Sequence, residues 1–577
     1  MTRTARIEPI TPPGSVYASE AFAATLAASG RQDCALEYVG EVSLAKGYGE
    51  SRVYRLAARR VRRPGTRLGC GAAPGGVANS TIRRCRLAFP SATSPPPMSA
   101  SEDPASTPLP LAVDLDGTLL RGDLLMEAAV SFIRRRPLNV LRLLRWFLSG
   151  RAALKAEVAK AVSLELAFSP VNPGLMKMLQ RRQSLGLPTV LVTASDRAYA
   201  ELVAARFGLF DAVLASDGQT NLRGKEKARA LSARFPDGFA YAGNAIADLP
   251  VWRSSAQVIA VNASPRVVAK ARAMGKPVTV LDPAQSVARA VWRSMRPHHW
   301  AKNALVFVPA LTAHRYLEGG TLVACLVMAI ALSLVASGAY LVNDVLDIEH
   351  DRRHASKRLR PIAAGDLSVT HALAFAAMLV VAGLGLGFAL RGHAGTLVLL
   401  AYLATTLAYG LAFKAIPIVD VVVLAGLYVL RIVIGIVTIG SAYSAWLLGF
   451  AATLFLSLAV AKRYTEVARY GVDHAPLAGR GYAARDATPL LALGVGAMFA
   501  ALTLFVLYLA EDAVPAARYA RPEWLWTIPP LLFVWLGRIW LLAVRGKLHD
   551  DPVDFALRDK ASLLLGAGVG LAFLAAA

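Results

Sequence analysis

Cysteine and histidine are scarce in this sequence, with 4 and 9 residues among 577. Cys34, Cys70 and Cys85 lie in an irregular N-terminal region, and Cys325 lies inside an apolar run. Thiols so few and so scattered indicate neither a disulfide framework nor a zinc knuckle. The folded parts are therefore compatible with a reducing cytosol.

Acidic residues are also few, because 39 Asp and Glu stand against 63 Lys and Arg and leave a net charge of +24. No stripe of basic residues interleaved with aromatic residues accompanies this charge, which argues against nucleic acid as a partner. A mean hydropathy of +0.45 and 55% hydrophobic residues indicate an integral membrane protein instead. We therefore expect a lipid bilayer as a partner, with positive charges that flank the spans.

Regular periodicity is missing from residues 1–107, which contain the proline-rich stretch SATSPPP. No charged segment followed by a long apolar core and a cleavage site is present, so a secretory signal is excluded. We predict a disordered extension here. Met98 is a plausible second start, and much of residues 1–97 is expected to be over-called or dispensable.

Residues 108–283 alternate short strand-forming runs with helical stretches. The runs are LAVDLD, PTVLVTAS, DAVLAS, FAYAGN and QVIAVN. This alternation predicts an α/β domain with a parallel sheet that helices cover on both faces. A helical segment at about 124–185 is inserted between the first two runs. Its stretch LNVLRLLRWFLSG is expected to pack in the core, with contact to a bilayer surface as the alternative.

Two aspartates, Asp114 and Asp116, stand at the carboxyl end of the first predicted strand, where open parallel sheets bind their ligands. A strand that ends at Thr193, a lysine in GKEKARAL and the segment GNAIAD follow in order. This series resembles the four motifs of the haloacid dehalogenase (HAD) superfamily. The resemblance implies a Rossmann-like fold with a helical cap and phosphatase chemistry.

The HAD resemblance implies that Asp114 attacks phosphorus to form an aspartyl-phosphate and that Asp116 is the general acid and base. It also implies phosphate binding by Thr193 and Lys227, with Lys225 as a rival, and Mg²⁺ binding by Asp114, Asp116, Asn244 and Asp248. Motif four usually begins with an acid, so Asn244 removes charge from the metal site, although its carbonyl oxygen still suits Mg²⁺. A phosphatase fold kept only as a scaffold is the alternative.

Long apolar runs begin only after residue 303, and they predict an all-α polytopic membrane domain over residues 284–577. We expect about nine transmembrane helices, near 303–317, 321–342, 369–390, 394–413, 417–438, 444–461, 487–510, 524–544 and 561–577. Loops on one side hold fifteen Lys and Arg and those on the other side hold four. The positive-inside rule therefore places the α/β domain in the cytoplasm and the C-terminus outside the inner (cytoplasmic) membrane.

The stretch NDVLDIEHDRRH follows the second predicted span directly. On a helix Asn343, Asp347 and Asp351 share one face, and Asp344 adjoins them. Because like charges repel, a cation should lie among them, and oxygen-only ligands favour Mg²⁺ shared with phosphate oxygens. A solvated polar loop is the alternative.

Together with the predicted spans, the stretches RPHHWAKN, NDVLDIEHD, KRLRPIAAG and AKRYTEVARY resemble the UbiA superfamily of intramembrane prenyltransferases over residues 292–577. The resemblance implies a diphosphate-containing co-substrate held through Mg²⁺ by Asn343, Asp344, Asp347 and Asp351. It further implies that phosphate oxygens are neutralised by Lys357, Arg358 and Arg360.

A second aspartate-rich motif is expected after the sixth span of this superfamily, but here Lys462 and Arg463 stand with a single acid, Glu466. Fewer acids suit an additional phosphate, and this pattern resembles the decaprenyl-phosphate phosphoribosyltransferase branch. The resemblance implies transfer of 5-phosphoribose from phosphoribosyl diphosphate to a polyprenyl phosphate, after which the HAD domain removes the 5-phosphate. Prenylation of an aromatic acceptor is the alternative, and a scaffold without activity is a third.

Further polar residues lie in or beside the predicted spans. Arg431 is a candidate for phosphate binding or for a structural ion pair, and Asp420 lies in the same span. Lys302, Tyr409 and Lys414 are candidates for substrate contact or for anchoring at the interface. His299 and His314 are expected to be structural or interfacial.

Overall fold

The computed structural model describes residues 108–136, 138–217, 221–442, 444–469, 480–517, 519–548 and 551–577, and three strands nearer the N-terminus. These strands form an antiparallel sheet in the order β1-β3-β2, within a unit that ends at Pro96. Their bounds are β1 Tyr17–Ser19, β2 Cys34–Ser43 and β3 Glu50–Ala58. This differs from the disorder predicted there, since the two longer strands are rich in Val, Leu and Tyr, which favour strands. The rest of that prediction, including the proposed start at Met98, lies outside the described residues.

The α/β domain is built on a six-stranded parallel sheet in the order β6-β5-β4-β7-β8-β9. The predicted strands and their parallel pairing are confirmed, and β9 is an addition. The strands are β4 Leu111–Val113, β5 Thr189–Asp196, β6 Ala212–Ser216, β7 Ala240–Gly243, β8 Gln257–Val261 and β9 Val278–Leu281.

Helices cover both faces of this sheet. Alternate residues of each strand point to opposite sides, and apolar residues on both sides require a covering layer. In β4, for example, Leu111 and Val113 join the core on one face and Ala112 joins the core on the other. The first core includes residues of α2 Leu124–Arg135, α4 Arg151–Ala161, α5 Pro173–Ser184 and α6 Arg197–Phe207. The second includes residues of α7 Lys225–Arg234, α8 Leu249–Ser254 and α9 Pro265–Arg272.

Helix α3 Asn139–Leu148 of the inserted segment has two apolar faces. Leu143 and Trp146 pack against the core, as the first interpretation expects. Leu141 and Leu144 on the other side are exposed, so the contact with a bilayer surface stays a prediction. Short helical turns complete this region at η3 Leu166–Phe168 and η4 Ile246–Asp248.

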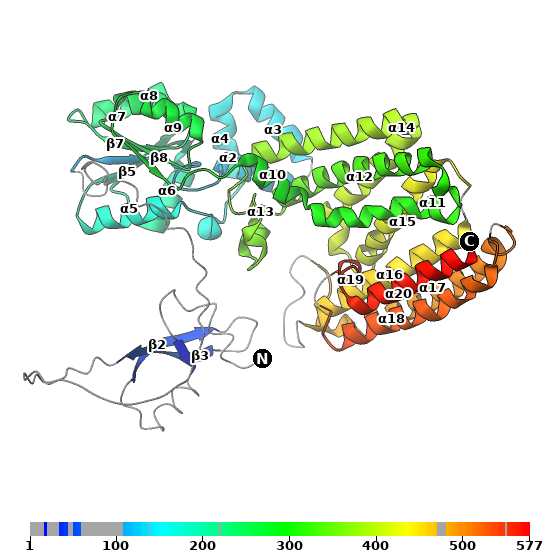
Figure 1. Ribbon diagram of the computed structural model, residues 1–577. Helices are drawn as coiled ribbons and strands as arrows, with labels where there is room; N and C mark the ends of the chain where they lie inside the picture. The colour runs from blue at the N-terminus through cyan, green and yellow to red at the C-terminus, as the bar shows by residue number, and fades with distance from the viewer. Residues whose placement is uncertain are drawn as a thin grey trace, which may run out of the picture. The chain divides into compact units, whose positions relative to one another are not determined.

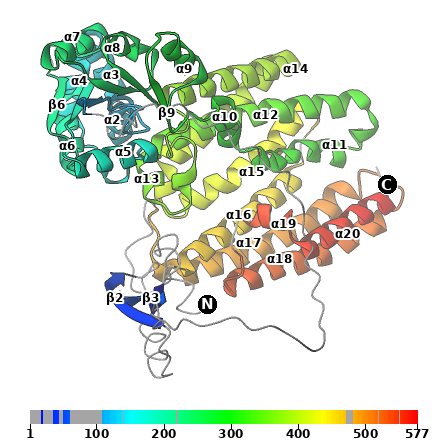
Figure 2. The ribbon, with the colours of Figure 1, turned by 60° about the vertical axis from the view of Figure 1, so that its left-hand side comes forward.

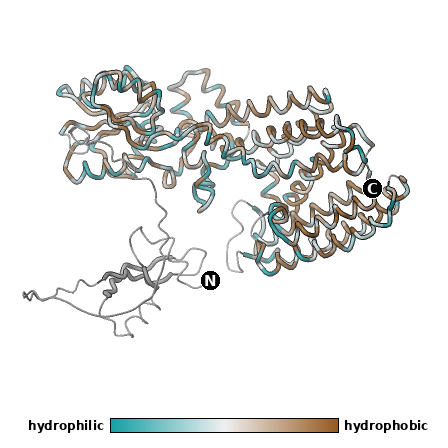
Figure 3. Tube along the Cα trace, in the orientation of Figure 1, coloured by the Kyte–Doolittle hydropathy of each residue, from teal (hydrophilic) through white to brown (hydrophobic). Residues whose placement is uncertain are grey.

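The membrane region contains six helices that are long and apolar enough to cross a bilayer, counted over the described residues. They are α12 Gly319–Leu346, α14 Val369–Leu411, α15 Val419–Ile439, α16 Ala445–Ala468, α17 Ala487–Tyr508 with its adjoining turns, and α18 Ile528–Val544 with η11 Pro522–Thr527. In Figures 1 and 2, α16, α17 and α18 form one group with α20 Lys560–Ala576, while α12, α14 and α15 form another. Figure 3 shows brown, hydrophobic residues along these helices.

Helix α14 reverses direction at Arg391 and Gly392, where the backbone leaves the helical region. A Cβ on Gly395 would lie 2.3 Å from the carbonyl oxygen of Gly387, so only glycine lets the two arms approach this closely. The two arms correspond to the spans predicted at 369–390 and 394–413.

The first predicted span, near 303–317, is not a transmembrane α-helix. The chain forms the 3-10 helix η5 Pro297–Phe307, the short helix α11 Val308–Thr312 and the turn η6 Arg315–Leu317. Two prolines limit regular helix formation, and buried Asn303 donates a hydrogen bond to Ser333 of α12 at 2.8 Å. The count of about nine transmembrane helices is therefore not confirmed.

Short elements connect the two regions and the long helices. Helix α10 Val287–Met295 precedes η5, and α13 Ile348–Arg353 and η7 Lys357–Leu359 follow α12. The remaining elements are η8 Phe413–Ala415, η9 Ala484–Asp486, the π-helical turn η10 Leu509–Ala513 and α19 Pro552–Ala556.

Candidate functional site

The first candidate site lies at the carboxyl end of the parallel sheet. Asp114 follows β4, and its Oδ1 lies 2.6 Å from Nζ of Lys227, which α7 supplies. The pair is buried, and Lys227 also donates to the hydroxyl of Tyr241 at 3.0 Å. A lysine held this close neutralises a carboxylate, as a reaction between a carboxylate and a phosphate requires. The structure thus brings together Asp114 and the favoured lysine, while Lys225 is the first residue of α7.

Asp116 has two hydrogen-bond donors. The hydroxyl of Ser195 donates to Oδ2, and the backbone N–H of Leu124 donates to Oδ1 at 2.9 Å. Thr193 lies within β5, two residues before Ser195, and its hydroxyl accepts from the backbone N–H of Ser195 at 2.9 Å. Ser195 thereby links Thr193 to Asp116, and phosphate binding by Thr193 stays a prediction.

The fourth motif is organised by Asp248, whose carboxylate is fully hydrogen-bonded. Its Oδ1 accepts from Tyr241 at 2.9 Å, and its Oδ2 accepts from the backbone N–H groups of Asn244 and Ala245 at 2.9 Å each. The side chain of Asn244 lies against the backbone of motif one, since a Cβ on Gly117 would be 2.0 Å from its Nδ2. Asn244 therefore lies beside Gly117 of motif one, and Asp248 shapes the loop and lies within electrostatic range of Asp114.

Both aspartates of motif one are affected by their burial. Burial raises the pKa of Asp114 to about 6, although the Lys227 ammonium opposes this shift. Burial also raises the pKa of Asp116 to about 7, and the carboxylate of Asp123 adds to the effect. In the metal-free protein, protons therefore occupy these carboxyls in part near pH 6.

We expect Mg²⁺ binding at the α/β site to be on the order of tenfold tighter at pH 8 than at pH 6, because the metal must displace protons from Asp114 and Asp116. Isothermal titration calorimetry at the two pH values, in buffers of different ionisation enthalpy, measures both the affinity and the protons released. Asp116→Asn should remove most of the pH dependence. Equal affinities at pH 6 and pH 8 in the parent protein would contradict this expectation.

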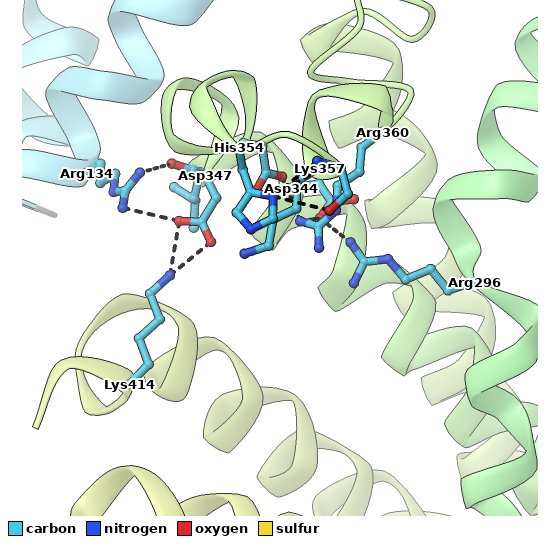
Figure 4. Close-up of polar contacts among 11 residues, drawn as sticks. Arg134, Arg296, Asp344, Asp347, His354, Lys357, Arg360 and Lys414 are labelled. Atoms are coloured by element: carbon cyan, nitrogen blue, oxygen red, sulfur yellow. Dashed lines mark hydrogen bonds and ion pairs between the residues drawn. The ribbon is translucent and has the colours of Figure 1, made fainter. Parts of the chain in front are cut away.

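The second candidate site lies where α12 ends and α13 begins (Figure 4). Arg360 NH1 lies 3.1 Å from Oδ1 of Asp344 and 2.6 Å from Oδ2 of Asp351, so one guanidinium joins the two carboxylates. Arg296 contacts Asp344 as well. The sequence predicts a cation among these acids, and arginine side chains occupy that place.

Asp347 points away from this pair, as Figure 4 shows. Its carboxylate lies 2.9 Å from Nζ of Lys414 and 3.2 Å from NH2 of Arg134, which belongs to α2. The helix on which Asn343, Asp347 and Asp351 are expected to share one face is interrupted at Asp347, the residue between α12 and α13, although the N–H of Asp347 still bonds to the carbonyl oxygen of Asn343 at 2.9 Å. The acids therefore form two subsites, each with its own basic partners. Their common role as metal ligands stays a prediction.

Two further basic residues of this loop are more accessible to solvent than the buried acids Asp344 and Asp351. Lys357 is half-buried and Arg358 is exposed. Burial lowers the pKa of Lys357, and the carboxylate of Asp351 opposes this shift. Their proposed contact with phosphate oxygens stays a prediction.

A third polar cluster lies between η5, α16 and α19. Nζ of Lys302 lies 3.4 Å from Oδ1 of Asp551 and 3.2 Å from Oδ2 of Asp554, and Nζ of Lys462 lies 2.9 Å from Oδ2 of Asp551. His299 Nδ1 lies 3.5 Å from Asp554. The predicted basic residues Lys302 and Lys462 are thus brought together around acids that come from the late segment DDPVD.

Arg463 forms part of a buried network of ion pairs. Its Nε lies 2.8 Å from Oδ2 of Asp420, and it also contacts Glu466. Arg480 lies 3.8 Å from Glu466. Tyr409 lies within electrostatic range of Lys462 and Arg463. This network joins the end of α16 to the start of α15.

Family models match both regions of the chain. Residues 304–558 match the UbiA prenyltransferase family, and residues 111–253 match the haloacid dehalogenase-like hydrolases. The chain is 38% identical over 471 residues to an uncharacterized protein y4nM from Sinorhizobium fredii, which covers 81% of this chain and 91% of that protein. The chain belongs to the UbiA prenyltransferase family. It carries a HAD-like hydrolase domain at its N-terminal side.

Two other relatives match parts of this UbiA-family chain. The nodulation protein NoeC from Azorhizobium caulinodans is 34% identical over 286 residues, which cover 48% of this chain and 91% of that protein. The decaprenyl-phosphate phosphoribosyltransferase from Corynebacterium glutamicum is 36% identical over 189 residues, which cover 32% of this chain and 57% of that protein.

The UbiA region offers oxygen ligands for Mg²⁺. Asn343 Oδ1 and Asp344 Oδ2 are buried and have no hydrogen-bond partner among the residues that the structure describes, so each is available to a cation. In the described part of the chain, no three His, Cys, Asp or Glu side chains are arranged as a metal-binding group. The residues therefore fit an ion that takes two or so protein ligands and completes its shell with phosphate oxygens and water.

Several residues at these sites are not predicted by the sequence motifs. In the HAD-like domain, Lys155 of α4 reaches over the strand ends and donates to the backbone oxygen of Ala194 at 2.6 Å. In the UbiA region, Arg296, Asp551 and Asp554 complete the ion pairs described above. The charged residues in RPHHWAKN and HDDPVD are the only sequence signal for these ion pairs. The two stretches lie far apart in the sequence, so the pairing itself is not predicted.

Arg431 lies within α15, and among the described residues it forms no ion pair with a carboxylate. Its Nε donates to Asn303 Oδ1 at 3.0 Å, NH1 to the backbone oxygen of Leu427 at 2.5 Å, and NH2 to Tyr402 at 2.9 Å. These acceptors are neutral, so the structural ion pair considered for Arg431 is not formed with them. His314 packs its ring against Tyr519 at a centroid distance of 4.4 Å, as a structural residue would.

Proposed function

We propose that this protein transfers 5-phosphoribose from phosphoribosyl diphosphate to a polyprenyl phosphate and that its HAD-like domain then removes the 5-phosphate. The observation that carries the proposal is the presence, in one chain, of a phosphatase-type site and a UbiA region that is 36% identical to a decaprenyl-phosphate phosphoribosyltransferase. A phosphorylated product gives a phosphatase on the same chain a substrate at high effective concentration.

The basic residues of the UbiA region support a reaction with more than one phosphate group. Arg360 and Lys414 accompany the acids that follow α12, and Lys302 and Lys462 surround Asp551. We propose that the first pair neutralises the diphosphate of the donor and that the second pair neutralises the phosphate of the lipid. A lipid phosphate oxygen then attacks the anomeric carbon, and diphosphate leaves.

Mg²⁺, when bound, stabilises the charge of the departing diphosphate. We propose that Asn343, Asp344, Asp347 and Asp351 would hold it between the two subsites, some of them directly and the others through water or phosphate oxygens. We further propose that Arg360 and Lys414 exchange a carboxylate for phosphate oxygens when substrate enters. In the HAD-like domain we propose Asp114 as nucleophile, Asp116 as acid and base, Thr193 and Lys227 as phosphate ligands, and Asn244 with the paired aspartates as metal ligands. Asp248 would act through the loop that it organises.

The proposed function also concerns the location and orientation of the protein in the membrane. We propose that it is a multi-pass protein of the inner (cytoplasmic) membrane with both sites on the cytoplasmic side, because basic residues dominate the loops that flank them. Phosphoribosyl diphosphate is water-soluble and is therefore met on that side. Cysteine substitutions at Arg358 and Arg521, tested with a membrane-impermeant thiol reagent, should label from opposite sides of the membrane.

We expect purified protein, supplied with labelled phosphoribosyl diphosphate, polyprenyl phosphate and Mg²⁺, to transfer the label into the lipid fraction. Transfer should stop when EDTA removes the metal, because the departing diphosphate then lacks its counter-charge. The control replaces polyprenyl phosphate by the free polyprenol. Consumption of a polyprenyl diphosphate and a phenolic acid, without transfer of the ribose label, would show that the protein prenylates an aromatic acceptor instead.

A further inference from the structure

Helix α2 of the HAD-like domain contacts both candidate sites. At its first residue, the backbone N–H of Leu124 donates to Asp116 Oδ1 at 2.9 Å. Near its last residue, Arg134 NH2 lies 3.2 Å from Asp347 Oδ1, and Arg134 NH1 donates to the backbone oxygen of Leu346 at 2.8 Å. Ten helical residues span only about 15 Å. One short rigid element therefore joins the phosphatase site to the loop of the transferase site.

A buried ion pair fixes α2 to α13. Both guanidinium NH groups of Arg352 donate to the carboxylate of Glu127, at 2.7 and 2.8 Å, and the two side chains are 6% and 5% exposed. Arg352 Nε also donates to the backbone oxygen of Ala363 at 3.1 Å. A buried, bidentate ion pair between arginine and a carboxylate has one favourable geometry. The position of α13, which carries Asp351, thus depends on a residue of the HAD-like domain.

Close packing surrounds this pair. Val130 of α2 lies in one apolar core with Leu341 and Val345 of α12. A Cβ on Gly365 would lie 2.4 Å from Cβ of Arg121, and this glycine has a φ of +75°, so the contact requires glycine. The surface of the UbiA region therefore packs closely against α2 and against Arg121 in the loop before it.

Arg134 acts at the point where α12 ends. Leu346 is the last residue of α12, and Asp347 is at once its C-cap and the N-cap of α13. A guanidinium on the final carbonyls of a helix satisfies an otherwise unpaired acceptor and interacts well with the helix dipole. Together with Lys414, which contacts both carboxylate oxygens at 3.0 and 2.9 Å, Arg134 sets the direction in which the Asp347 carboxylate points.

We propose that α2 of the HAD-like domain is a structural part of the transferase site and that Arg134 is a positioning residue which holds Asp347 for magnesium diphosphate. This inference rests on the proposed function only in placing a diphosphate at the loop after α12. It adds that the two sites depend on one helix. The first residue of α2 donates a hydrogen bond to Asp116 of the phosphatase site, and Arg134 near its end pairs with Asp347 of the transferase site.

Binding of inorganic diphosphate with Mg²⁺ to the full-length protein in nanodiscs tests the inference, by calorimetry. Diphosphate leaves in phosphoribosyl and in prenyl transfer alike, so the result is independent of the substrate. Arg134→Gln is expected to raise the Kd about tenfold, and Arg134→Lys to restore part of the affinity. The matched control is Arg136→Gln, which removes the same charge two residues later from an exposed side chain and should leave the Kd unchanged.

Hydrolysis of p-nitrophenyl phosphate by the HAD-like domain of the same variants supplies the second measurement. Arg134→Gln should leave this activity and the thermal unfolding midpoint near the parent values, because the side chain is 40% exposed and distant from Asp114. Equal Kd values for Arg134→Gln and the parent, or equal weakening by Arg136→Gln, would overturn the inference. A parent protein that binds no magnesium diphosphate would instead overturn the proposed site itself.

Discussion

Replacing Asp351 by Ala is expected to abolish transfer while the protein remains inserted in the membrane. Asp351 is buried, and its carboxylate holds Arg360 at 2.6 Å beside Asp344. Without it, Mg²⁺ would lose a proposed ligand, and Arg360 would lose the partner that orients it toward the site. We expect at least about a 100-fold loss of activity, since even residues that only support metal ligands cost 10- to 100-fold. Asp347→Ala should have an effect of similar size.

The measurement is incorporation of labelled phosphoribose into lipid by equal amounts of purified variants. Glu318→Ala is the matched control, because it removes a carboxylate at the opposite end of α12, where Glu318 pairs with the exposed Arg315. This control should retain the activity of the parent. More than a few per cent of activity in both Asp347→Ala and Asp351→Ala would count against these residues as metal ligands.

The α/β fold could be predicted because its strands are local features of the sequence. Runs such as PTVLVTAS are apolar, short and followed by turn residues, and each one is a parallel strand in the structure. The same holds for Asp114 and Asp116, which directly follow a strand and must therefore lie at the edge where ligands bind. Lys227 was identified through its motif, and it lies 2.6 Å from Asp114.

Contacts across long sequence separations could not be predicted. Glu127 and Arg352 are separated by 225 residues, and each alone looks like an ordinary charge of a helix. The same is true of Lys302 and Asp551, which meet only because η5 packs into the helical region. The end of α12 at Leu346 was also missed, since NDVLDIEHD continues a helical pattern and contains no proline or glycine. This helix end determines which acids face one another.

Asp114→Asn is expected to change the lipid product from its ribosyl form to its 5-phosphoribosyl form. Asparagine keeps the shape of the side chain but cannot form an aspartyl-phosphate, so the phosphatase step should fall by at least about 1000-fold. Mass spectrometry of the extracted lipid measures the change as one additional phosphate. Transfer of the ribose label itself should continue, because Asp114 has no contact with the loop after α12 among its hydrogen bonds and ion pairs.

Asp116→Asn is the companion variant that separates chemistry from stability. Asp114→Asn leaves the buried Lys227 ammonium without its carboxylate, and an unpaired buried charge destabilises a domain. Asp116→Asn keeps the pair of Asp114 and Lys227 and changes the proposed acid and base, which is also a proposed metal ligand, so both variants should yield the phosphorylated lipid. Parent and variants must be compared as purified proteins, free of other phosphatases. The same phosphorylation state in all three would show that the HAD-like domain acts on a different phosphate ester or serves as a support for the transferase.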